Sequence, residues 1–168
     1  MTSIRLVELL YDLRKSVSKI LHKSFSERID HQVFQPDKQV LAIWAAECAE
    51  RVLPYFEERS PDDDRPRSAI EAIREWVSTG VFKMSVIRGA SLSAHAAAKG
   101  KTELDVIFAA HAAGQAVGTV HVPTHALGAA LYSIRAVAAH SGKVDDGLKE
   151  RDWQLHRLHI LARQSIAK

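Results

Sequence analysis

The fold is decided by residues 106–134, VIFAAHAAGQAVGTVHVPTHALGAALYSI, which contain no Asp, Glu, Lys or Arg. Most of these side chains are Ala, Gly, Val or Leu, and charged residues return at 101–105 and at Arg135. A helix that is apolar on all sides is buried. We therefore expect this segment to lie inside a helical bundle. It should be divided by a kink or turn at 122–124, because the ring of Pro123 clashes with a continuous helix.

The rest of the chain predicts amphipathic helices. Apolar residues recur every three to four positions, and no alternation typical of strands is present. The expected helices cover residues 3–22, 37–58, 67–78, 81–99, 102 to the break at Pro123, 124–139 and 147–166. In the helix at 81–99, Val81, Met84 and Ile87 should lie on one side, together with Ser91, Ala94 and Ala98. We predict an all-α, single-domain bundle (residues 1–168) of about six or seven helices around a small-residue, Ala/Gly-rich central helical pair. Helices 3–22 and 147–166 should pack on a core at about 40–140.

The composition of the chain limits which kinds of partner and which cellular compartment we expect for it. The 168 residues carry 23 basic and 20 acidic side chains, a net charge of +3, which is too small to indicate a nucleic-acid partner. One cysteine, Cys48, excludes an intramolecular disulfide. The histidines, Gln115 and Pro123 make residues 106–134 too polar for a membrane span. We expect a cytoplasmic protein without a signal peptide, a membrane partner or a cofactor.

Charged residues gather around the start of the helix at 67–78. They are Asp62, Asp63, Asp64, Arg65, Arg67, Glu71 and Arg74. One aspartate should cap the helix, and another should bridge to Arg65 or Arg67. Glu71 can pair with Arg67 at i, i+4 or with Arg74 at i, i+3. Three adjacent carboxylates also fit a divalent cation or acid–base chemistry, and that alternative stays open.

Histidines are the other polar residues of interest. His121 and His125 have the i, i+4 spacing that places two imidazoles on one helix face for a metal ion. If the helices before and after Gly100 form a hairpin about that residue, His95 should face residues near 106, well short of His111. We therefore expect the four histidines not to converge, and we expect most of them to be buried and hydrogen-bonded. No catalytic motif is recognisable in the chain, so no catalytic residue is predicted.

Four segments carry a resemblance to a known family. They are LAIWAAECAERVLPYFEE (41–58), PDDDRPRSAIEAIREWVSTG (61–80), SAHAAAKG (93–100) and AAGQAVGTVHVPTHALGAALYSIRAV (112–137). Together they resemble the fifth, all-helical family of immunity proteins assigned to bacterial polymorphic-toxin systems. The resemblance covers about residues 40–140.

This resemblance implies a protein that binds and neutralises a partner toxin, with no catalysis of its own. It implies a polar cluster, either for binding or for structure, made of Asp62, Asp63, Asp64, Arg65, Arg67, Glu71, Arg74, His95, His121 and His125. Two alternatives stay open. One is a metal-dependent enzyme that uses His121, His125 and one or more of the three aspartates. The other is a self-associating structural or adaptor domain, which would form a homodimer.

Overall fold

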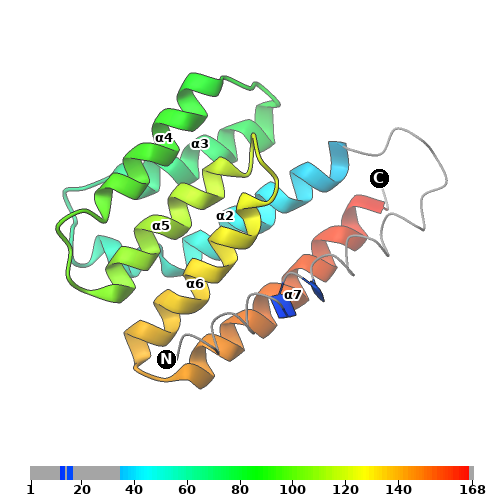
Figure 1. Cartoon of the computed structure of the whole chain (residues 1–168). Helices are drawn as coiled ribbons and strands as arrows, with labels where there is room; N and C mark the ends of the chain where they lie inside the picture. Colours follow the sequence, from blue (N-terminus) through cyan, green and yellow to red (C-terminus); the bar gives the residue numbers. More distant parts are fainter. Residues whose placement is uncertain (1–11, 14, 17–34, 167–168) are drawn as a thin grey trace.

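Six α-helices form the bundle in the computed structural model, which describes residues 12–13, 15–16 and 35–166 (Figure 1). They are α2 (Gln35–Glu57), α3 (Arg65–Thr79), α4 (Met84–Ala97), α5 (Leu104–Gly118), α6 (His125–Ser141) and α7 (Val144–Ile166). No strand occurs in these described ranges. The expected all-α bundle is therefore confirmed. Most of the helix expected at 3–22 lies outside the described residues, as does the connector that follows it.

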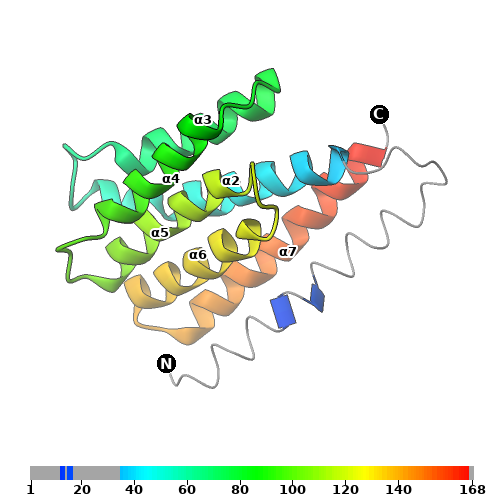
Figure 2. The ribbon, with the colours of Figure 1, turned by 45° about the horizontal axis from the view of Figure 1, so that its top comes forward.

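The helices form two layers of three. One layer holds α4, α5 and α6 side by side, and the other holds α3, α2 and α7 behind them (Figures 1 and 2). The middle helix α5 packs against α2, α3, α4 and α6, while the outer helix α4 packs against α3 and α5. The face of the first layer that points away from α2 is therefore free of other described helices.

Small side chains of α5 allow this close packing. All nine of its buried residues are Ala, Gly or Val, and α5 shares one buried core with α2, whose Trp44 and Phe56 are fully buried. Within the described part of the chain, no helix combines the length and the apolar character that a membrane crossing needs. Pro123 lies in the turn between α5 and α6, so the expected break at 122–124 is confirmed.

A buried polar network joins the second layer together. The indole N–H of Trp44 donates to the carbonyl oxygen of Gln154 at 2.8 Å. Arg51 of α2 donates three hydrogen bonds to Glu150 of α7, whose side chain is only 3% exposed. The guanidinium also lies over the ring of Trp153 at 3.9 Å. A buried carboxylate requires such a partner. This network fixes α7 against α2.

The start of α4 differs from the prediction. The helix begins at Met84 rather than at Val81, because Lys83 has an extended backbone (φ −129°, ψ 106°). Ile87 is buried as expected, but Val81 and Met84 are 59% and 48% exposed. Phe82 is also exposed, with the ammonium group of Lys38 5.8 Å from its ring. The expected start of this helix at Val81 was therefore wrong, and Met84 does not share the burial of Ile87.

Candidate functional site

The acidic run before α3 forms a local arginine bridge. Asp63 accepts two hydrogen bonds from the guanidinium of Arg65, at 2.8 and 2.7 Å, and one from the backbone N–H of Arg65 at 3.3 Å. These hydrogen bonds hold the pKa of the Asp63 carboxyl below its usual range. Asp64 occupies the N-cap position without a side-chain capping bond, and Asp62 is exposed. The expected bridge is thus present, whereas the expected capping hydrogen bond to an aspartate at the N-cap is not.

The remaining arginines of this group connect α3 to α2. Arg67 donates to Glu57 at 2.7 Å, and Arg74 donates to Glu50 at 2.8 Å. The expected pairing of either arginine with Glu71 was wrong, because carboxylates of α2 lie within reach and Glu71 is exposed on α3. These contacts join two helices side by side.

Histidines from α4 and α5 meet on the free face of the first layer. The Nδ1 atoms of His95 and His111 are 2.8 Å apart, and the two ring centroids are 5.0 Å apart. The expectation that these histidines stay apart was wrong. Residues 98–103 do not make a symmetric hairpin about Gly100, because they carry the chain beyond the end of α4 before α5 begins. His95 therefore lies beside the middle of α5 rather than near its first residues.

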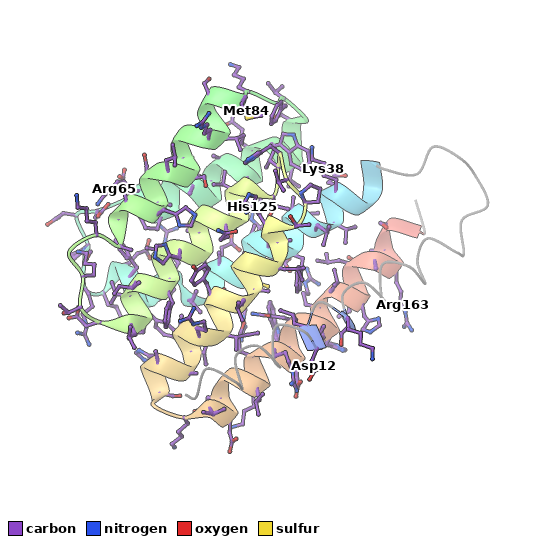
Figure 3. All side chains as sticks on the ribbon, viewed as in Figure 1. Asp12, Lys38, Arg65, Met84, His125 and Arg163 are labelled. Atoms are coloured by element: carbon purple, nitrogen blue, oxygen red, sulfur yellow. The ribbon has the colours of Figure 1, made fainter. Side chains whose placement is uncertain are left out.

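A second histidine pair lies at the turn between α5 and α6. The ring centroids of His121 and His125 are 5.6 Å apart, and the Nδ1 atom of His125 is 2.7 Å from the amide oxygen of Gln115 on α5. His125 is labelled near the top of α6 in Figure 3. The Nδ1 atom of His121 is buried, with no hydrogen-bond partner among the described residues. We call His95, His111, His121 and His125, together with Gln115, the histidine row.

Glycines provide the surface on which the histidine row lies. A Cβ atom at Gly114 would be 2.8 Å from two ring atoms of His95, and one at Gly118 would be 3.2 Å from the ring of His125. A Cβ at Gly128 would collide with the side-chain amide of Gln115. The glycines of the Ala-rich segment therefore make room for polar rings as well as for neighbouring helices.

An aromatic extension continues the histidine row along α5 and α6. The ring of Tyr132 lies 5.1 Å from that of His111 and 6.1 Å from that of Phe108, between centroids. The guanidinium of Arg135 then lies over Phe108 at 4.1 Å. Half-buried aromatic and arginine side chains are enriched where proteins bind one another. These contacts form a continuous strip of imidazole and aromatic rings across three helices.

Burial favours the neutral form of the imidazoles of His95, His111 and His125. It lowers the pKa of His95, where the neighbouring His111 and His125 add to the effect, and the pKa of His111, where Arg135 adds to it. Burial and the neighbouring His121 lower the pKa of His125 in the same way. A neutral imidazole offers one donor and one acceptor, so the strip can form hydrogen bonds and stacking contacts without carrying much charge.

The strip does not assemble a set of metal ligands in the described structure. No group of three or more His, Cys, Asp or Glu side chains there is placed to hold a metal ion. The thiol of Cys48 on α2 is fully buried, and this burial raises its pKa.

Five members of the strip were missed as site residues by sequence reasoning. They are Phe108, His111, Gln115, Tyr132 and Arg135. A signal was nevertheless present, because Phe108, His111 and Gln115 recur at intervals of three and four residues in a segment that is otherwise Ala, Gly and Val. The polar residues of that segment indicate its one uncovered face.

Comparison with known proteins identifies one family. The family model described as Imm-5 like putative immunity protein matches residues 31–160. The match includes all six described helices except the last turns of α7, and it extends beyond the segment at about 40–140. No curated protein and no solved structure matches the chain.

Proposed function

The chain belongs to the family of Imm-5 like putative immunity proteins, and we propose from this membership that it binds and neutralises a partner toxin without catalysis of its own. The family match over residues 31–160 is the observation that carries the proposal. An immunity protein acts by forming a complex, so its function requires a surface suited to another protein.

The histidine row and its aromatic extension are the surface we assign to this role. The free face of the α4–α5–α6 layer exposes rings of His95, His111 and Tyr132 only in part, which leaves apolar area for a partner to cover. Binding energy at protein interfaces is concentrated in such aromatic and arginine side chains. We also propose that the small-residue helices α5 and α6 form the centre of a single domain that includes α7 and positions this face.

The charged residues around α3 receive a structural role in this proposal. Arg67 and Arg74 use their guanidinium groups to hold α3 against α2, and Arg65 is bridged to Asp63. Their pairs are partly exposed, and exposed pairs contribute roughly 0–1 kcal/mol each. Substitution of Arg67 by Ala should therefore reduce stability slightly and leave toxin neutralisation intact.

A growth assay tests the proposal. Genes that flank this one would be expressed singly in a surrogate bacterium, and then together with this chain. We expect one neighbour to stop growth and this chain to restore it. The double variant His111→Ala/Tyr132→Ala should restore growth less well at equal protein level, whereas Arg67→Ala should match the unchanged chain. Toxicity that persists in the presence of the well-expressed, folded chain would refute the proposal.

The two alternatives from the sequence have separate tests. Metal content of protein purified without chelator addresses a metal-dependent enzyme that uses His121 and His125. Molecular mass at micromolar concentration addresses self-association. Neither alternative gains support from the contacts described above, so both stay predictions.

A further inference from the structure

A pocket of about 350 Å³ lies at the end of the aromatic extension, where α5 begins and α6 ends. It is lined by Leu104, Phe108, Arg135, Ala138, Ala139, Gly142 and Val144. The guanidinium of Arg135 is the only charged side chain of this lining. The walls are apolar, so the pocket combines one cation with a surface that favours apolar groups.

Arg135 differs from most arginines of the described structure, and of the three that form no ion pair there (Arg88, Arg135 and Arg163) it is the one that lines this pocket. Arg51, Arg59, Arg65, Arg67, Arg74, Arg151 and Arg157 each form an ion pair with a carboxylate. Arg135 has no carboxylate partner among the described residues and is held by aromatic rings instead, 4.1 Å from the centroid of Phe108 and 5.7 Å from that of Tyr132. The stacking orients the guanidinium and leaves its N–H groups available.

Two carboxylates near the pocket are engaged elsewhere, and the exposed Asp145, which follows Val144, forms no ion pair with Arg135. Asp105, which follows Leu104 on α5, is 2.9 Å from the Nδ1 atom of His140. Asp146, in the first turn of α7, accepts from Lys149 at 2.9 Å. The charge of Arg135 is thus not neutralised by a bonded carboxylate from either neighbouring helix.

We propose that this pocket binds an acidic side chain of the partner toxin. The carboxylate would accept two parallel hydrogen bonds from the guanidinium of Arg135, and its aliphatic stem would contact Phe108, Leu104 and Ala138. A planar guanidinium matches a carboxylate in this bidentate geometry, and the apolar walls would contact the rest of the side chain. The inference rests on the proposed function for the identity of the partner. The chemistry of the pocket itself can be tested without the toxin.

A small carboxylate supplies that test. Phenylacetate combines a carboxylate with an apolar ring, phenylacetamide is its neutral analogue, and inorganic phosphate is an anion without an apolar part. Each would be titrated into the full, isotope-labelled chain, and NMR would follow the side-chain Nε–H signal of Arg135 and the backbone N–H signals of Leu104 and Gly142. We expect saturable shifts of these signals with phenylacetate and much smaller shifts with the other two probes.

Variants locate the effect in the pocket. Arg135→Gln should weaken phenylacetate binding by about tenfold or more, because a hydrogen-bonded charge is lost. Arg88→Gln is the matched control: Arg88 is exposed on α4, has no carboxylate partner among the described residues and lies outside the pocket lining. If Arg135→Gln fails to fold, Arg135→Lys keeps the charge and loses the bidentate geometry, and it should still bind more weakly than Arg88→Gln.

Each outcome decides the inference. The inference is overturned if phenylacetate does not shift the NMR signals of Arg135, Leu104 and Gly142. It is also overturned if phenylacetamide or phosphate shifts them as much as phenylacetate does, or if Arg135→Gln binds phenylacetate as tightly as the unchanged chain. A pocket that binds phenylacetate while the chain neutralises no neighbouring toxin would refute the proposed function and leave the carboxylate site standing. A chain that neutralises a toxin but does not bind phenylacetate would refute only the pocket.

Discussion

Gly114 offers the sharpest test of the histidine row. An added Cβ at this position would lie 2.8 Å from both Cδ2 and Nε2 of the His95 ring and 3.0 Å from its Cε1. An added Cβ at Gly89, in the neighbouring helix α4, would meet nothing within 4 Å. Both glycines lie inside helices, so Gly→Ala has the same intrinsic effect on the backbone at both positions. The two substitutions therefore differ in the contact with His95.

The two substitutions should change the free energy of unfolding in opposite directions. Gly89→Ala should stabilise the chain by up to about 1 kcal/mol, the difference in helix propensity between the two residues. Gly114→Ala gains the same amount, but overpacking costs roughly 1–3 kcal/mol. Displacement of the His95 ring also breaks its hydrogen bond with His111, which is worth about 1 kcal/mol. The sum is a net destabilisation of about 1–3 kcal/mol for Gly114→Ala.

Thermal and urea unfolding would measure both variants. For a chain of this length, 1 kcal/mol corresponds to a change in Tm of about 2–4 °C, so the two variants should move in opposite directions by several degrees. The same substitution in a His95→Ala background completes a double-mutant cycle. Without the ring, Gly114→Ala should become neutral or stabilising. If it stabilises the unchanged chain as much as Gly89→Ala does, then the His95 ring does not lie on Gly114 and the row is placed incorrectly.

Three further predictions follow from buried groups. Arg51→Ala leaves the Glu150 carboxylate buried without its partner and should lower the free energy of unfolding by about 2–4 kcal/mol. The control Lys149→Ala removes a largely exposed lysine from its ion pair and should lower the free energy of unfolding by less than about 1 kcal/mol. Equal losses for the two variants, measured from urea midpoints at pH 7, would contradict this prediction. Burial lowers the pKa of three imidazoles in the histidine row, so the unfolded chain binds protons first as pH falls. The free energy of unfolding should stay level from about pH 8 to 7, decrease below about pH 6.5 and level off below the folded-state pKa values. Urea midpoints that rise between pH 6.5 and 5 would contradict the lowered pKa values of these imidazoles. Cys48 should resist a thiol reagent in the folded chain at pH 8 and react fully in urea, and rapid reaction of the folded chain would argue against its burial.

Much of the fold was predictable because it depends on local patterns. The 3.6-residue periodicity located the six described helices, with shifts of a few residues at their ends. Gly80, with φ 69°, ends α3 as a left-handed residue, and Pro123 separates α5 from α6. These features depend on neighbouring residues in the chain. A single sequence is sufficient to recognise them.

The site was harder to predict because it depends on register between helices. Whether His95 meets residues near 106 or His111 is decided by the path of residues 98–103, whose extended part carries the chain beyond α4. The partners of Arg67 and Arg74 were missed for a similar reason. Glu57 and Glu50 lie on α2, and the i, i+4 rule considers only charges on the same helix.

The uncharged outer stripe of α5 connects the fold to the proposed function. Packing explains why residues that face α2, α3, α4 and α6 are small and apolar. It does not explain the uncovered side of the helix, where Leu104, Phe108, His111 and Gln115 recur without one charged residue. Charged side chains at such positions would be solvated and would cost the fold little. A partner that covers this side would have to desolvate them, and charge is depleted at the centres of protein interfaces for that reason. The stripe therefore has the composition expected at the centre of a protein interface, which supports the proposed function, and Arg135 lies at its edge.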